Sequence, residues 1–238
     1  MDHFMKIHTA KNNVDYDILK NIFKNISEDK LDYILKYSTI RKYQKGDLIL
    51  NKENCHTALY ILLDGIIQIG YLSPSGRFHA FNYFSEKHLI NLLPCLNTQV
   101  IDYDYYAFNQ VKVLQIPQHI FIEEINDNNH LKQDALNILS RRMQYLIQQV
   151  KFLQVANLHQ KVCKVLHDLS IQYGRSHPLG TEIKLKISQH DLADLLSASR
   201  QTINKEIKNL ASQNILDWQY ENIVIKNKEY LNYQINWI

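Results

Sequence analysis

The stretch that decides the fold is residues 187–210, ISQHDLADLLSASRQTINKEIKNL. Read with a period of 3.6 residues, it carries two short apolar stripes, each typical of a helix that buries one face. The stripes are Leu192, Leu195 and Leu196, then Ile203, Ile207 and Leu210. Between them, residues 197–199 leave room only for a tight turn, and Ser188 and Ser199 are placed as N-caps. Two short helices joined by a tight turn form a helix-turn-helix pattern.

The second of these helices carries polar side chains on its outer face. Arginine and lysine hydrogen-bond guanine in the major groove of DNA, while glutamine and asparagine match adenine, so such a face suits base reading. The side chains are Arg200, Gln201, Asn204, Lys205 and Lys208. On this pattern alone, a solvated helical hairpin inside another α-rich domain remains an open alternative.

A hairpin is predicted directly after the second helix. Residues 218–231, WQYENIVIKNKEYL, alternate as two short strands about Glu221 and Asn222. A hairpin in this position is a wing, which commonly touches the phosphate backbone beside the groove. The two helices and the hairpin together predict a winged helix-turn-helix domain.

Residues 187–216, ISQHDLADLLSASRQTINKEIKNLASQNIL, resemble the DNA-binding segment of the CRP/FNR transcription regulators. The S-R-x-T-[VI] core of that family is present as Ser199, Arg200, Thr202 and Ile203. The resemblance implies that the second helix reads bases, while the start of the first helix meets phosphates. The expected DNA-binding residues are Ser188, Gln189, Ser199, Arg200, Gln201, Asn204 and Lys205. Ser197 replaces the family's turn glycine, so a left-handed backbone there would cost about 1 kcal/mol.

From about residue 39 to residue 116, the pattern changes to short apolar runs broken by turn signals. Strands spaced in this way predict a β-sandwich or a barrel-like roll. The block is similar to the cyclic-nucleotide-binding β-roll of the CRP/FNR regulators. It matches K-G-[DE]-x-[IL] at residues 45–49 and L-Y-x-[IL]-x-x-G-x-[IV]-x-[IV] at residues 59–69. Helical spacing is predicted before it, at residues 15–25 and 27–37.

The ligand-holding part of this block departs from the family pattern. In cyclic-nucleotide-binding members, a cassette resembling F-G-E-x-[AGS]-L supplies a Glu for the ribose hydroxyl, and a downstream R-[ST]-A cradles the phosphate. In this sequence Asn91 stands at the position of the cassette Glu, and Ile101 and Asp102 stand at the positions of the Arg and the following Ser or Thr. One lost bond to a charged group is worth about 1.5–3 kcal/mol, and Asp102 would repel an anion. We therefore predict a degenerate pocket that binds neither cyclic AMP nor cyclic GMP.

The same altered cassette contains Cys95 and the tyrosines Tyr103, Tyr105 and Tyr106. A small apolar or thiol-containing effector, redox sensing through Cys95 and ordinary packing of strand side chains all remain open here. The 11 histidines are dispersed along the chain. With no Cys-x-x-Cys or His-x-x-Cys spacing, we predict no haem, iron–sulfur cluster, metal or other cofactor.

A long helix is predicted after residue 129, with apolar residues spaced alternately three and four apart. This a/d heptad seam is typical of two helices that pack knobs into holes. The seam is Leu136, Leu139, Met143, Leu146, Val150 and Leu153. A helix lying on its own β-roll is the alternative, but the resemblance favours dimerisation, because the family dimerises through this helix. Asn157 is the expected hinge, and a helix at 158–173 and a short strand at 182–187 follow.

Composition sets the remaining limits. A chain of 238 residues with 45% hydrophobic content can bury cores in two domains, and a net charge of +3 is too small to argue for nucleic-acid binding by itself. The 3 cysteines, odd in number and far apart, suit reduced thiols of a cytosolic protein. There is no apolar run of membrane-spanning length and no signal-peptide core, so we expect a cytoplasmic location.

The expected fold is therefore α+β. Residues 1–130 would form N-terminal helices and a double-stranded β-helix, the jelly-roll-like cyclic-nucleotide-binding fold; residues 131–157 a dimerisation helix; and residues 158–238 a winged helix-turn-helix domain. The expected function is a sequence-specific transcription regulator that binds an inverted-repeat operator as a homodimer, with RNA polymerase as a further partner if it activates. An effector-gated or redox-gated module is the alternative. An enzyme is disfavoured, because the sequence has no P-loop and no Ser/His/Asp order.

Overall fold

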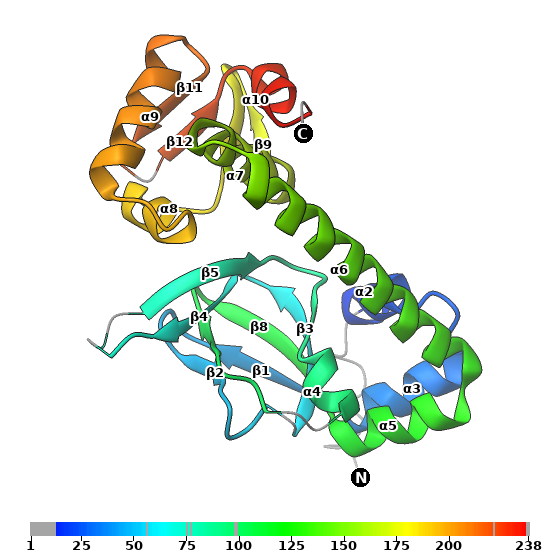
Figure 1. Cartoon of the computed structure of the whole chain (residues 1–238). Coiled ribbons are helices and arrows are strands. Elements are labelled where there is room, and N and C mark those ends of the chain that lie inside the picture. Colours follow the sequence, from blue (N-terminus) through cyan, green and yellow to red (C-terminus); the bar gives the residue numbers. More distant parts are fainter. Residues whose placement is uncertain are drawn as a thin grey trace. The chain divides into compact units, whose positions relative to one another are not determined.

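The computed structural model describes residues 13–236, apart from residues 56, 75, 77, 98, 99 and 221 (Figure 1). The expected wing-turn residue Glu221 therefore lies outside the described residues. The chain forms two compact units, and the main division falls inside the long helix α6 (Asn129–Val155), between Arg142 and Met143. A short stretch before it, His79–Phe81, groups with the second unit.

The described part of the first unit starts with two short helices and continues as a β-roll. The helices are α2 (Asn13–Ile22) and α3 (Glu28–Tyr37), and the strands are β1 (Thr39–Tyr43), β2 (Leu48–Leu50), β3 (Ala58–Asp64), β4 (Ile67–Leu72), β5 (Phe78–Phe84), β6 (Leu89–Ile90), β7 (Asp104–Ala107) and β8 (Val111–Pro117). The helix α4 (Leu92–Asn97) lies between β6 and β7, and α5 (Gln118–Asp127) leads into α6. The strands form two sheets, in the orders β1-β8-β3-β6 and β2-β7-β4-β5.

The central strand β3 explains why the sequence shows no alternation here. Tyr60 and Leu62 belong to the core between the two sheets, while Leu59 and Ile61 belong to the core that the roll shares with its helices. A strand buried on both faces is apolar along its length, as in ALYILL. The turn that follows needs a glycine, because Gly65 has a φ of +91° and a Cβ there would lie 2.2 Å from a backbone oxygen.

The second unit, beyond α6, combines helices with one four-stranded sheet. Its elements are α7 (Leu158–Gln172), β9 (Gly174–His177), β10 (Gly180–Ile183), α8 (Gln189–Leu195), α9 (Arg200–Ser212), β11 (Leu216–Gln219), β12 (Asn222–Ile225) and α10 (Lys228–Ile235). The sheet order β11-β12-β10-β9 joins the wing to the hairpin that precedes the helix-turn-helix. Helix α6 ends at Val155 and α7 begins at Leu158, and Asn157 caps α7 in a capping box with Gln160. The role of Asn157 as a hinge stays a prediction.

Two sequence predictions in this unit are wrong. The strand expected at 182–187 ends at Ile183, because β10 pairs with β9 and then leaves the sheet. The second wing strand, expected to run to residue 231, ends at Ile225. Asn227 accepts a hydrogen bond from the Tyr230 amide and starts α10, a helix whose only buried residue, among those the structure describes, is Leu231.

Candidate nucleic-acid interface

Helix α8 begins at a capping box on Ser188. The Ser188 hydroxyl oxygen accepts from the Asp191 amide at 3.2 Å, and the Asp191 carboxylate accepts from the Ser188 amide at 2.7 Å. The Ser188 hydroxyl also donates to that carboxylate, at 2.8 Å. Ser188 therefore fixes the start of α8. A DNA phosphate that contacted Ser188 would also lie close to the Asp191 carboxylate.

The turn between α8 and α9 contains one residue with a left-handed backbone. Ser197 has a φ of 49° and is exposed. Its amide donates to the carbonyl of Asp194 at 3.1 Å, and the Ala198 amide donates to the carbonyl of Ala193 at 2.9 Å. These bonds satisfy carbonyls at the end of α8, so the turn is well defined although its residue is not glycine.

Replacing Ser197 with glycine should stabilise the second unit. Glycine takes up a left-handed backbone without the Cβ clash that costs other residues about 1–2 kcal/mol, although its unfolded-state entropy offsets part of that gain. We expect Ser197→Gly to raise the free energy of unfolding by up to about 1 kcal/mol in denaturant titrations. Ser197→Ala keeps the Cβ and is the control. A glycine variant no more stable than this control would contradict a strained turn.

Helix α9 presents the predicted recognition face. Ser199 is its N-cap, with the hydroxyl oxygen accepting from the Thr202 amide at 3.1 Å. The predicted apolar stripe of Ile203, Ile207 and Leu210 is buried. On the opposite face the exposed side chains are Arg200, Gln201, Lys205 and Lys208, and Asn204 is half-buried.

A histidine outside the helix-turn-helix holds α9 against two other helices. His159 of α7 places Nδ1 2.9 Å from Glu206 Oε2 of α9, and its Nε2 lies 3.1 Å from the Tyr230 hydroxyl of α10. The Cys163 sulfur lies 3.7 Å from the same Nε2, and burial followed by nearby Glu206 raises the pKa of this thiol to about 12. The His159 imidazole therefore contacts the recognition helix α9 near its middle. The neighbouring Cys163 thiol stays protonated at neutral pH. This contact could not be predicted from sequence, because its members are far apart along the chain.

The starts of α8 and α9 and the tip of the wing line one hollow of about 610 Å³. Across it, Gln189 Oε1 accepts from Asn204 Nδ2 at 2.7 Å, which ties α8 to α9. From the predicted DNA-binding set, the hollow gathers Ser188, Gln189, Arg200 and Asn204. Ser199, Gln201 and Lys205 lie outside its lining. His190 and Tyr220 complete the lining, and both were missed at the sequence level.

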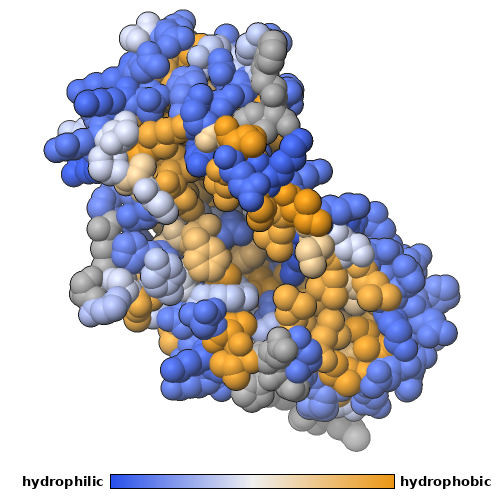
Figure 2. Space-filling model, viewed as in Figure 1, coloured by the Kyte–Doolittle hydropathy of each residue, from blue (hydrophilic) through white to orange (hydrophobic). Residues whose placement is uncertain are grey.

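The predicted a/d stripe of α6 is largely uncovered in the single chain. Its exposed members are Leu136, Met143, Leu146, Val150 and Leu153. Leu139 differs, because it is partly buried against the core that the β-roll shares with its helices. Figure 2 shows apolar side chains gathered along the visible face of α6.

Arg142, next to this stripe, does not stay in solvent as a charged residue on a surface helix would. Its Nη2 donates to the carbonyl of Leu89, and the side chain is half-buried near Tyr103 and Tyr105. Desolvation lowers the pKa of this guanidinium from its ordinary value. Arg142 therefore joins α6 to the edge of the β-roll.

The described residues also bear on two other classes of protein. No helix there combines the length and apolar character needed to cross a membrane. In the same ranges, no three His, Cys, Asp or Glu side chains are grouped so that they could hold a metal ion.

Comparisons with known proteins match both units. Family models match a cyclic nucleotide-binding domain at residues 40–128 and a Crp-like helix-turn-helix domain at residues 160–233. The CRP-like cAMP-activated global transcriptional regulator of Mycobacterium tuberculosis is 19% identical over 210 residues, which cover 88% of this chain and 94% of the relative. The anaerobic regulatory protein of Bacillus subtilis is 22% identical over 213 residues, covering 88% of this chain and 89% of the relative.

A solved structure gives the same fold. A CRP/FNR-family transcriptional regulator from Thermus thermophilus superposes with a TM-score of 0.69 at 17% identity, covering 83% of this chain and 98% of the other. The relatives are transcriptional regulators and not enzymes, in agreement with a sequence that predicts no catalytic site. With a cyclic-nucleotide-binding-like β-roll followed by a helix-turn-helix DNA-binding domain, this chain belongs to the CRP/FNR family of transcriptional regulators.

Proposed function

We propose that this regulator binds an inverted-repeat operator as a homodimer and does not respond to cyclic AMP. The observation that carries the proposal is the exposed polar face of α9, held on a folded and capped helix-turn-helix. A face of arginine, glutamine and lysine at the start of such a helix suits the donor and acceptor pattern of the major groove.

The uncovered stripe of α6 supports the homodimer. An apolar stripe at heptad spacing is stable in water only when a partner covers it, and a second copy supplies a complementary stripe. Two parallel α6 helices would present two recognition helices about 34 Å apart, one turn of DNA. A twofold protein on duplex DNA then selects an inverted repeat.

Base reading is assigned to three exposed side chains of α9. Arg200 and Lys205 suit guanine, while Gln201 suits adenine. Many family members carry Glu where Gln201 stands, and Glu accepts a hydrogen bond from cytosine. The preferred operator should therefore differ from theirs at the base that this side chain reads.

Selection of bound duplexes from a random pool tests this function. The wild-type protein should enrich an inverted repeat, and Gln201→Glu, which keeps the length of the side chain, should change one base per half-site from adenine to cytosine. Enrichment of no common sequence would refute a sequence-specific regulator. An unchanged consensus for the variant would refute only the role of Gln201.

The cassette of the β-roll supports the absence of a cyclic AMP response. Asn91 is buried and donates through Nδ2 to the carbonyls of Ala58, at 2.7 Å, and of Cys55. From sequence, Asn91 aligns with the Glu of the family cassette. Its φ of 73°, a backbone that glycine favours, supports a second alignment, with Asn91 at the glycine and buried Leu92 at the Glu. In either alignment the ribose-binding carboxylate is missing. Asp102 is exposed and Ile101 is buried, so neither replaces the phosphate-binding arginine.

Cyclic AMP should leave the protein's melting temperature unchanged. A ligand present at 100 times its Kd stabilises the folded state by about 2.7 kcal/mol, which shifts a melt by several degrees. We expect no such shift with millimolar cyclic AMP or cyclic GMP, and unchanged operator affinity in the same buffer. A saturable shift that follows the nucleotide concentration would contradict the degenerate pocket.

The burial of Cys95 argues against the redox alternative. Its side chain is fully buried, and desolvation followed by nearby Cys55 raises the pKa of the thiol to about 12. A redox-sensing cysteine needs thiolate character and exposure, and this thiol has neither at neutral pH. Ordinary packing inside the β-roll is the role that these surroundings favour.

A further inference from the structure

We propose that the first unit holds a binding site for a small phosphate-bearing anion, formed by Lys87, Arg141 and Arg142. The site lies outside the cyclic-nucleotide cassette, because Asn91 and Asp102 do not line it. Such a site does not depend on the proposed DNA-binding function or on the state of the cassette.

The site is a pocket of about 180 Å³ that lies within the first unit. The end of α2, the turn between β5 and β6, and α6 line it, three segments that are far apart in the sequence (Figure 1). One water molecule takes up about 30 Å³ of liquid, so the pocket has room for a small ion. Pockets for larger organic ligands usually measure about 300–1,000 Å³, which makes a whole nucleotide too large for this one.

The charge of the pocket lining is positive. Lys87, Arg141 and Arg142 line it without any carboxylate, and within the described ranges none of the three forms an ion pair. Asp134, two turns earlier on α6, is buried and engaged, because its carboxylate accepts from the Asn25 amide at 3.0 Å and from Asn25 Nδ2 at 2.9 Å. The carbonyl end of α2 adds about half a negative charge, which leaves most of the three positive charges unbalanced. An ion with two negative charges therefore suits the pocket.

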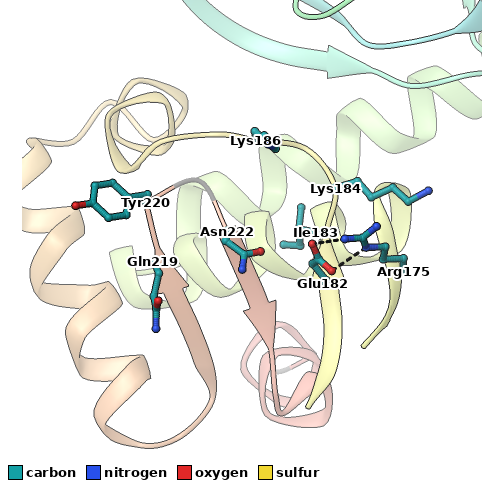
Figure 3. Close-up of a pocket in the computed structure, with 8 residues that line it drawn as sticks. All are labelled: Arg175, Glu182, Ile183, Lys184, Lys186, Gln219, Tyr220 and Asn222. Atoms are coloured by element: carbon teal, nitrogen blue, oxygen red, sulfur yellow. Dashed lines mark hydrogen bonds and ion pairs between the residues drawn. The ribbon is translucent and has the colours of Figure 1, made fainter. Parts of the chain in front are cut away.

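Arg142 is half-buried, and no carboxylate among the described residues offsets its charge. Its Nη2 donates to the carbonyl of Leu89, which satisfies one of the five guanidinium N–H groups but supplies no negative charge. Arg175 shows the pairing that a guanidinium prefers, since it donates to the Glu182 carboxylate through Nε and Nη2, at 2.7 Å each (Figure 3). Phosphate oxygens accept from the same planar fork in the same two-bond way. A phosphate in the pocket would therefore give Arg142 the counter-ion that desolvation of a charge calls for.

Lys87 occupies a turn position where glycine would be less strained, because its φ is 68°. The turn is well anchored: the Lys87 amide donates to the carbonyl of Leu62 at 2.8 Å, and the Leu62 amide donates to the carbonyl of His88 at 2.9 Å. His88 Nδ1 also lies 2.9 Å from the carbonyl oxygen of Ser85. The Lys87 side chain is exposed, so it adds charge to the pocket and little packing to the β-roll. A charged side chain held on a strained backbone beside two arginines suits a contact with a ligand.

The pocket also has an apolar part. Leu89 and Ile138 are buried and Ile22 is half-buried, and all three line it. Apolar walls exclude water and strengthen the attraction between an anion and the nearby cations. They also suit the organic part of a phosphate monoester. The ligand class is therefore a phosphate dianion, either free phosphate or a small phosphate monoester.

Thermal melting with inorganic phosphate, at an ionic strength held constant with chloride, tests the site. A ligand near 100 times its Kd raises the melting temperature by several degrees, so the wild-type protein should gain at least about 3 °C and the gain should saturate. The double variant K87Q/R141Q removes two exposed charges and should bind phosphate at least about thirtyfold more weakly. The matched control is K42Q/K45Q, which removes the same charge from exposed positions of the first unit outside the pocket and should behave as the wild type does.

Titration calorimetry provides the second readout and separates the two sources of the phosphate group. Inorganic phosphate should bind the wild-type protein with one ion per chain. Phenyl phosphate should bind at least about tenfold more tightly than inorganic phosphate if the apolar walls take the organic part of a monoester, whereas equal or weaker binding would assign the site to free phosphate. Succinate, which carries two negative charges without a phosphate group, should bind at least about tenfold more weakly than inorganic phosphate.

Three results would overturn the site. The first is a wild-type protein whose melting temperature shows no saturable rise with phosphate. The second is an equal rise in the wild type, in K87Q/R141Q and in K42Q/K45Q, which is the general stabilising effect of phosphate on folded proteins. The third is succinate binding as tightly as phosphate, which would leave an unspecific cluster of positive charge.

Discussion

Leu146→Glu is expected to convert the proposed dimer into single chains and to weaken operator binding at least about a hundredfold. Leu146 lies at the centre of the exposed α6 stripe, between Met143 and Val150. Burying a leucine is worth about 1.5–3 kcal/mol, so the two symmetry-related leucines contribute about 3–6 kcal/mol. The variant also places two like charges in one apolar seam, which adds to the loss.

Sedimentation of the variant measures this change as a fall from two chains to one. Gln148→Glu is the matched control, because it introduces the same charge at an exposed position of α6 outside the seam. It should remain a dimer and bind the operator as the wild type does. A Leu146→Glu protein that still sediments as two chains would place the dimer interface elsewhere.

Arg200→Ala is expected to abolish discrimination between operator and random DNA without unfolding the protein. One bidentate arginine–guanine contact is worth about 1–3 kcal/mol, so the two in a dimer contribute about 2–6 kcal/mol, at least about thirtyfold. The side chain is exposed at the start of α9, and the cap on Ser199 does not depend on it. The melting temperature should therefore change little.

Arg200→Lys separates charge from geometry at the same position. Lysine keeps the positive charge but lacks the planar fork that holds two acceptors of one guanine. It should retain affinity for random DNA and its salt dependence, and lose most of the discrimination. Competition titrations with operator and random duplexes measure both quantities. If Arg200→Ala discriminated as the wild type does, Arg200 would not read bases.

The helix-turn-helix could be predicted from sequence because its signals are local. Caps at Ser188 and Ser199, two apolar stripes and the short turn between them all lie within one short stretch. Each of these is decided by near neighbours in the chain. The same reasoning identified the exposed stripe of α6.

Elements that depend on partners far along the chain could not be predicted. Helix α10 has a single buried residue among those described, Leu231, so its 3.6-residue period is too weak to compete with an apparent strand alternation. The half-buried position of Arg142 depends on a carbonyl 53 residues away, at Leu89. The contact between His159 and Glu206 spans 47 residues.

Changing the spacing between half-sites tests the symmetric dimer most directly. Inserting about five base pairs, half a helical turn, between the halves of the selected operator turns one half-site to the opposite side of the duplex. We expect the affinity to fall at least about a hundredfold, to that of a single half-site. Equal affinity for the two duplexes would mean that each chain reads its half-site independently, and would contradict a pair of recognition helices held at one fixed separation.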